Sequence, residues 1–156
     1  MSNGEIRVDD KEVIKALANL SFKAMNKAYR QGMKKSLDPI LKQTKVNLRS
    51  SGIKHVNKPY IGKNGKKYKS MLQGVKSSVY MGDTEDSWGK VHIMSEFRLK
   101  FFEKGTNERH TRKGWKRGSI TPKWFFRNAV NQKGKEATDN LDENIRKAIL
   151  KAWEKK

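Results

Sequence analysis

The residues of this 156-residue sequence best suited to acid–base or metal chemistry are its three histidines, His55, His92 and His110. The chain contains no cysteine, so disulfides, thiolate metal sites and cysteine nucleophiles are excluded together. No histidine has a second histidine at the i, i+4 spacing that presents two ligands on one helix face, and no HExxH motif occurs. The histidines therefore predict neither a metal site nor a bound cofactor.

One group of carboxylates, Asp83, Glu85 and Asp86, is compact enough to raise the question of a divalent cation. A metal-dependent nuclease needs several carboxylates around its ion. These three fall in a turn between two predicted strands, where acidic side chains commonly serve the turn geometry. We therefore expect a turn without a metal ion, and we expect that the chain is not an enzyme.

The segment from Gly62 to Lys67 reads GKNGKK and superficially resembles a phosphate-binding loop. It lacks the GxxxxGK[ST] spacing and does not join a strand to a helix, so a solvated turn explains it better. Asn64-Gly65 within it is a strong hairpin-turn signal and predicts a small excursion of the chain.

Charge is the property of the composition that bears most on partners, since 36 Lys and Arg against 16 Asp and Glu give +20. Between Pro39 and Gly82 there are ten Lys or Arg and no acidic residue. Such an excess attracts polyanions, above all nucleic acid, or is neutralised by an acidic protein partner. Two predicted basic loops, 54–69 and 107–118, hold the candidate phosphate contacts, which are Lys63, Lys66, Lys67, Arg109, Arg112, Lys113, Lys116 and Arg117.

Aromatic residues are interleaved with these cations, and Tyr60, Tyr68 and Trp115 are the ones that would stack on bases. The alternative is that Trp115 packs over the edge of the domain while the Lys and Arg side chains project into solvent. We favour this alternative, because no recognition-helix or RNA-binding signature accompanies the charge. Weak contact with DNA, without sequence preference, stays open.

The elements that must position these residues begin with a long helical segment. Apolar residues recur at helical spacing from Val13 to Leu48. Gly32 weakens the pattern, and Asp38-Pro39 predicts either a kink or a fresh helix start. The segment is therefore one long helix or a broken pair, and Ser50-Ser51-Gly52 ends it.

The remaining pattern mixes strands and helix. Alternating apolar and polar residues from Val75 to Met81 and from Trp88 to Met94 predict an antiparallel hairpin. Pro122 is predicted to open a C-terminal helix, which Gly134 interrupts, so that it is one helix or two. The prediction is a single α+β domain over residues 1–156, with a small antiparallel sheet between a long N-terminal helical segment and a C-terminal helix.

No apolar run approaches the ~20 residues of a membrane span. The first residues, MSNGE, lack a signal-peptide pattern. We therefore expect no membrane contact and a protein that is made and used in a soluble compartment.

Two stretches, Phe101-Phe102-Glu103-Lys104-Gly105-Thr106 and, after a variable loop, residues 120–129, resemble a known family. It is that of siphophage neck or tail-completion proteins, whose type member is a minor tail component of a lambdoid coliphage. Its pattern is an aromatic-flanked Glu-x-Gly-Thr, a loop, and a Pro-x-Pro-Phe-x-x-x-Ala helix start. Lys123-Trp124 stands where a second proline is common. The signature residues that match are Glu103, Gly105, Thr106, Pro122, Phe125 or Phe126, Arg127 and Ala129.

The resemblance implies a structural protein of a phage or prophage, without catalytic residues or cofactor. It would act at the head–tail junction or in tail completion, through ring-forming contacts with copies of itself and with other neck and tail proteins. It would be made in the bacterial cytoplasm and located in the virion, and it can stay monomeric in isolation. The signature residues would be structural, with Gly105 suited to a positive φ. The rival interpretation is a non-sequence-specific nucleic-acid-binding protein that uses the basic loops, and a metal-dependent nuclease is the weakest.

Overall fold

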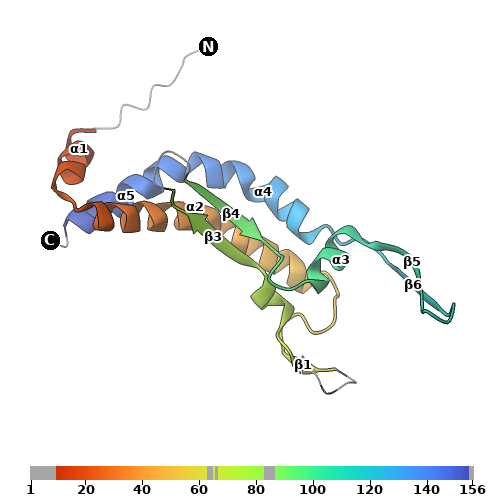
Figure 1. Ribbon diagram of the computed structural model, residues 1–156. Coiled ribbons are helices and arrows are strands. Elements are labelled where there is room, and N and C mark those ends of the chain that lie inside the picture. Colours follow the sequence, from red (N-terminus) through yellow and green to blue (C-terminus); the bar gives the residue numbers. More distant parts are fainter. Residues whose placement is uncertain (1–9, 63–64, 66, 83–86, 155–156) are drawn as a thin grey trace, which may run out of the picture.

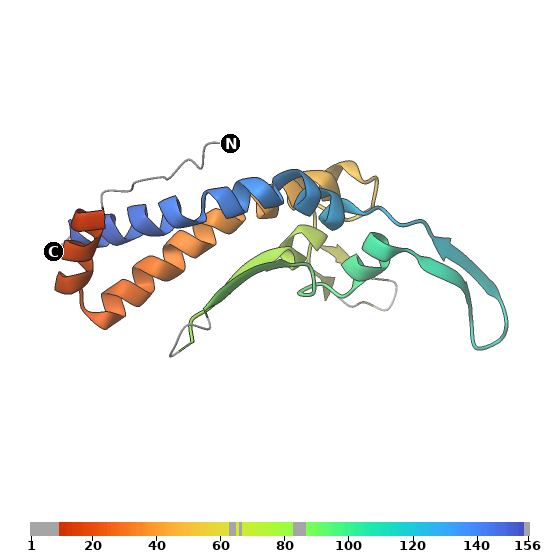
Figure 2. The same cartoon turned by 90° about the horizontal axis from the view of Figure 1, so that it is seen from above.

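One long helix, α2 (Phe22–Ser50), is the axis of the protein in the computed structural model (Figure 1). The structure describes residues 10–62, 65, 67–82 and 87–154. Helices α4 (Phe125–Asp139) and α5 (Leu141–Trp153) pack along α2 and form a helical layer with it. A β-hairpin and the short helix α3 (Arg98–Lys104) lie on one side of this layer (Figure 2). The predicted α+β class is confirmed.

The N-terminal helical segment is a broken pair, because α1 (Asp10–Asn19) ends before α2 begins. The break lies at Ser21, which is extended and whose hydroxyl accepts a hydrogen bond from the Ala24 N–H at 3.4 Å. The predicted kink or fresh start at Asp38-Pro39 is not where the pair divides, because Pro39 lies inside α2. A proline there removes one helical hydrogen bond, and packing of α2 against α4 and α5 offsets that loss.

Gly32 is a point of close approach between α2 and α5. A Cβ at this position would lie 2.5 Å from Ile145 Cα and 2.9 Å from the Asn144 carbonyl oxygen. The Ser36 hydroxyl donates to the Gly32 carbonyl, and the Asn144 amide donates to the Ser36 hydroxyl, each at 3.1 Å. Helices α4 and α5 separate at Asn140, so the C-terminal helix is indeed two helices, although the break is not at Gly134.

The predicted hairpin is confirmed as β3 (Lys76–Tyr80) paired antiparallel with β4 (Trp88–His92). It packs on α2, with Val91 half-buried and Ile93 buried. The main core lies where this hairpin, α3, α4 and the end of α2 meet. Its buried members are Leu48, Val56, Met71, Val75, Ile93, Leu99 and Phe125.

The predicted small antiparallel sheet is β3–β4, and the described strands form two further, separate antiparallel pairs. Strands β1 (Tyr60–Ile61) and β2 (Lys67–Tyr68) lie within the predicted basic loop 54–69. The predicted loop 107–118 is a hairpin of β5 (Thr106–His110) and β6 (Lys116–Ile120). Its glycines, which favoured a loop in the sequence, supply the positive φ of a tight turn at Gly114 and of an irregular register at Gly118.

Candidate functional site

The carboxylate of Glu103 holds the beginning of helix α4, although it belongs to α3. Its Oε2 accepts the Phe126 N–H and its Oε1 accepts the Arg127 N–H, both at 2.9 Å, and the residue is only 6% exposed. The first N–H groups of a helix have no intrahelical acceptor, and Trp124, which precedes α4, provides no side-chain cap. Glu103 therefore caps α4 from another element, and its negative charge also suits the positive end of the helix dipole.

The β5–β6 hairpin is here named the arm. Gly105 and Thr106 hold its two ends together. Gly105 has φ of 74°, as predicted, and a Cβ there would lie 2.6 Å from the Ile120 carbonyl oxygen and 2.8 Å from Pro122 Cδ. The Thr106 hydroxyl accepts the Ile120 N–H at 3.0 Å. The Lys123 N–H continues this closure by donating to the Phe102 carbonyl at 2.8 Å. These signature positions therefore close the base of the arm.

Pro122 does not open the last helix, which corrects the sequence-based prediction. Helix α4 begins three residues later, after Trp124 in a left-handed conformation with φ of 48°. Pro122 instead packs against Gly105, where the chain returns from the arm. The short connection that follows places Phe125 in the main core. The start of α4 lacks a capping side chain of its own, and Glu103 supplies the cap.

The remaining signature residues lie in the first turns of α4 and face two ways. Phe125 and Ala129 are fully buried against α2, and the Asn47 amide of α2 donates to the Phe125 carbonyl at 3.1 Å. Phe126 is half-buried beside the core. The Arg127 guanidinium lies 5.4 Å from the ring centre of Trp124 at the surface. The structure thus gathers the signature into one joint between arm, α3 and α4.

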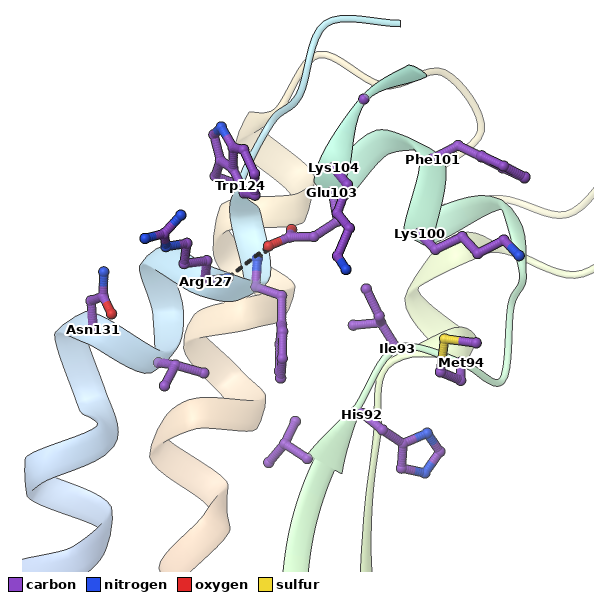
Figure 3. Close-up of a pocket in the computed structure, with 14 residues that line it drawn as sticks. His92, Ile93, Met94, Lys100, Phe101, Glu103, Lys104, Trp124, Arg127 and Asn131 are labelled. Atoms are coloured by element: carbon purple, nitrogen blue, oxygen red, sulfur yellow. Dashed lines mark hydrogen bonds between the residues drawn. The ribbon is translucent and has the colours of Figure 1, made fainter. Parts of the chain in front are cut away.

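Beside this joint is an open groove of about 930 Å³, bounded by α3, by α4 and by the chain at and after β4 (Figure 3). Its apolar lining includes Ile93, Met94, Phe101, Trp124 and Val130, of which all but Ile93 remain more than a third exposed. Lys100, Lys104 and Arg127 stand around it, and all three are exposed. Among the described residues that line it, Glu103 is the only acid, and both of its carboxylate oxygens accept helix N–H groups.

The arm carries most of the predicted phosphate contacts into solvent. From Asn107 to Ser119 every residue except Thr111 is exposed. The five cations are Arg109, Arg112, Lys113, Lys116 and Arg117. Glu108 is the one acid, which lies 3.5 Å from Lys116. Trp115, at the arm's turn, is 73% exposed, so the expectation that it packs over the edge of the domain is wrong.

The other basic segment is less free to bind bases. The rings of Tyr60 and Tyr68 stack on each other at 5.0 Å between centres, and His55 stacks on Tyr60 at 4.1 Å. Lys67 is exposed on β2. Lys63, Lys66 and Asn64 of the predicted turn lie outside the described residues. The described candidate contacts therefore lie on separate elements, Lys67 on β2 and the five cations on the arm.

Arg98 organises this tyrosine stack, and the sequence analysis missed it. Its guanidinium donates to Glu96 Oε1 at 2.6 Å, to the Tyr60 hydroxyl at 2.7 Å and to the Lys69 carbonyl at 3.2 Å. The bond from Arg98 lowers the pKa of Glu96, and the same bond raises the pKa of Arg98. No sequence signal links Arg98 to Tyr60, because 38 positions separate them.

The histidines are dispersed, with His55 on the tyrosine stack, His92 beside the groove and His110 on the arm. Within the described residues, no group of three His, Asp or Glu is placed to hold a metal ion. Asp83, Glu85 and Asp86 lie outside those residues.

Among the helices of the described part, none is long and apolar enough to cross a membrane. Comparison with protein-family models, with curated proteins and with solved structures finds no match to this chain.

Proposed function

We propose that this chain is a structural protein of a phage or prophage that acts at the head–tail junction or in tail completion, through ring-forming protein–protein contacts. The observation that carries the proposal is the arm. It extends from the body (Figure 1), and nearly all of its residues are exposed on both faces. An isolated two-stranded hairpin is marginally stable in water. An arm of this kind gains order when another molecule covers it.

The signature residues support the proposal by their placement. Glu103, Gly105, Thr106 and Pro122 form the joint that sets the direction of the arm relative to α4. Glu103 and Gly105 also line the groove, but the Glu103 carboxylate is engaged by two backbone N–H groups and so is not a free acid there. Residues that position an exposed arm have a structural role, as expected in a protein that takes part in an assembly. The protein is accordingly proposed to reside in the virion, at the neck or tail.

The proposal is tested in the phage or prophage that encodes the chain. Purified particles should contain the protein, and disruption of its gene should leave heads and tails unjoined or tails incomplete. Complementation with the full-length chain should restore joined particles, whereas a chain in which Gly-Ser replaces residues 109–117 should not. Absence of the protein from purified particles would remove the proposal.

A second candidate function rests on the charge of the arm. Five Lys or Arg and one Glu within β5–β6 and its turn give a local charge of +4, and Trp115 at the turn is free to stack on a base. These features favour non-sequence-specific contact with nucleic acid. Such contact is compatible with a neck protein that lies beside packaged DNA, so it is a rival only if it is tight and independent of assembly.

A further inference from the structure

Three aromatic rings form a stacked column beside the beginning of α3. The rings of His55 and Tyr60 have centres 4.1 Å apart and lie at 20° to each other, and those of Tyr60 and Tyr68 have centres 5.0 Å apart and lie at 11°. The Arg98 guanidinium lies 5.1 Å and 5.0 Å from the centres of the two tyrosine rings, and it donates to the Tyr60 hydroxyl at 2.7 Å. Tyr60 is therefore the middle ring, and the exposed His55 is one end of a column that Arg98 holds in place.

His55 also has an unusual backbone conformation. Its φ of 62° lies in the left-handed region, which residues with a side chain seldom adopt. Packing of its ring on Tyr60 offsets the cost of this conformation. Strained residues of this kind gather at ligand sites, where they preorganise a side chain for binding. The outer face of the His55 ring is therefore a preformed stacking surface.

An open pocket of about 680 Å³ adjoins His55 and lies between residues 52–55, α3 and the base of the arm. The β1–β2 pair and the arm both extend from this end of the molecule (Figure 1). The pocket therefore brings together the two basic segments of the sequence, which contribute Lys54 and Arg109 to its lining. Its volume lies within the range of about 300–1,000 Å³ that is usual for ligand sites.

The pocket is basic, and its described lining contains no Asp or Glu. Lys54, Arg109 and Lys123 are exposed around it. Three acids adjoin lining residues in the sequence, and each is already engaged by another partner: Glu96 by Arg98, Glu103 by the first N–H groups of α4, and Glu108 by Lys116. The three exposed cations therefore give the pocket a positive charge that no described acid neutralises.

Exposed phenylalanine rings complete the pocket. Phe97 is 58% exposed and Phe101 37% exposed, and their rings meet edge to face with centres 6.4 Å apart. Large apolar side chains exposed in one hollow mark an interaction site, and the surrounding cations select an anionic occupant. A ligand that combines flat rings with a row of negative charges matches both properties. Unpaired nucleotides have this combination, because their base faces are free and a phosphate follows each of them.

We propose that this pocket binds single-stranded nucleic acid. One base stacks on the outer face of His55, and Lys54, Arg109 and Lys123 bind the flanking phosphates. The paired bases of a duplex are already stacked on both faces, so the pocket selects unpaired strands, whereas the arm alone contacts the phosphates of either form. Stacking and phosphate contacts do not read base edges, so strands of any sequence are accepted. The inference does not depend on the proposed assembly function.

Fluorescence anisotropy of the full-length chain with a labelled oligothymidylate of about 16 nucleotides, the upper end of the usual single-strand site size, tests the stack. His55→Asn removes the ring and keeps a residue that tolerates a left-handed backbone. It should weaken single-strand binding about five- to tenfold, the lower part of the contribution of one stacked base, and leave duplex binding unchanged. His110→Asn on the arm is the matched control and should change neither affinity. An unchanged single-strand affinity in His55→Asn overturns the proposal.

A pair of lysine replacements tests the phosphate contacts. The log–log salt slope of single-strand binding is about -0.7 for each phosphate neutralised, so Lys54→Gln with Lys123→Gln should flatten it by about 1.4. The matched control, Lys23→Gln with Lys151→Gln, changes two exposed lysines near the beginning of α2 and the end of α5 and should leave the slope as it is. Equal slopes in the two double variants contradict the proposal.

Competition against the labelled strand identifies the occupant. Unlabelled oligothymidylate should displace the probe at a lower phosphate concentration than a duplex of the same length, and a polyglutamate peptide of matched charge should displace it only weakly. An oligouridylate is the RNA arm of the test: displacement by either single strand supports the site, and the tighter strand shows whether DNA or RNA is its source. Displacement by duplex or by polyglutamate that equals displacement by the single strand overturns the proposal, and the polyglutamate result assigns the pocket to an acidic protein partner.

Discussion

The Glu103 carboxylate and the backbone N–H of Phe126 are joined at 2.9 Å, across 23 positions of sequence. The segment between them contains the whole arm. One buried side chain therefore fixes where the arm leaves α3, where it returns, and how helix α4 begins. The capping group of α4 comes from another element, α3. Its replacement should therefore destabilise both the joint and the beginning of α4.

Replacement of Glu103 by Gln should destabilise the protein by about 1–3 kcal/mol. An amide can accept one helix N–H, but its NH₂ group then faces the second donor and leaves it without an acceptor. Urea unfolding followed by circular dichroism measures the difference, with Glu108→Gln on the exposed arm as the control that should change stability little. No in-vitro catalytic activity should be lost. A metal-dependent hydrolysis that disappears in Glu103→Gln would contradict the structural role.

Gly105 should tolerate no side chain, for two separable reasons. Its φ of 74° strains any L-residue, and a Cβ would meet the Ile120 carbonyl oxygen at 2.6 Å. Gly52 has φ of 73° with nothing within 4 Å of its Cβ position, so Gly52→Ala reports the backbone strain alone, about 1–2 kcal/mol. Gly105→Ala should cost more than Gly52→Ala in thermal or urea unfolding, and Gly105→Val more again. Equal costs at Gly105 and Gly52 would show that the arm base yields freely.

Two helical glycines should respond in opposite directions to alanine. At Gly32 a methyl group would collide with the backbone of α5, so Gly32→Ala should destabilise by about 1–3 kcal/mol through overpacking. At Gly134 the nearest atom is Val130 Cγ1 at 3.8 Å. Gly134→Ala should therefore stabilise α4 by about 0.5–1 kcal/mol, the ordinary gain in helix propensity. Denaturant midpoints of the two variants, measured together, check the signs.

The sequence predicted the parts of the fold that follow from local periodicity. The amphipathic pattern from Val13 to Leu48 and the alternation from Val75 to Met81 correspond to helices and to β3. The helix boundaries predicted from proline and glycine are misplaced. Both residues disfavour helix through local propensity, and tertiary packing overrides that preference here. Pro39 stays inside α2, and Gly32 is a contact point and not a break. The sequence predicts a loop where the arm lies, because the strands of the arm are charged on both faces and so lack the alternation that identifies a half-buried strand.

For the candidate site, sequence reasoning found the signature residues and the positive φ of Gly105. It did not find what the residues do, since the Glu103 cap and the Arg98–Tyr60 contact join positions 23 and 38 apart. The groove was likewise hidden, because its lining comes from β4, α3 and α4. Contacts between segments that are distant in the sequence cannot be predicted from the spacing of residues in a single sequence.

The Glu96–Arg98 pair should make stability depend on acid pH. The lowered pKa of Glu96 in the folded state means that the pair stabilises the fold fully above the ordinary glutamate range near 4.5, and that this stabilisation is lost as the pH falls through the lowered value. Denaturant midpoints at neutral pH and near pH 3 should therefore fall less in Glu96→Gln than in the parent chain. Glu154→Gln, just beyond α5, is the matched control and should fall as the parent does. An identical fall in Glu96→Gln and the parent would show that the pair contributes nothing.

The arm should bind DNA weakly and without sequence preference. Cations that neutralise phosphates release counterions, so the affinity falls with salt with a log–log slope of about -0.9 for each phosphate neutralised on duplex DNA. Replacement of Arg109, Arg112, Lys113, Lys116 and Arg117 by Gln should flatten this slope by several units. The matched control replaces five exposed lysines at the far helical end and at the end of α5, which are Lys11, Lys15, Lys23, Lys27 and Lys151. Fluorescence anisotropy across a salt series, with two unrelated duplexes, measures both. Tight, salt-resistant and sequence-selective binding would favour the nucleic-acid function over the assembly function, and no binding even at low salt would assign the charge of the arm to an acidic protein partner.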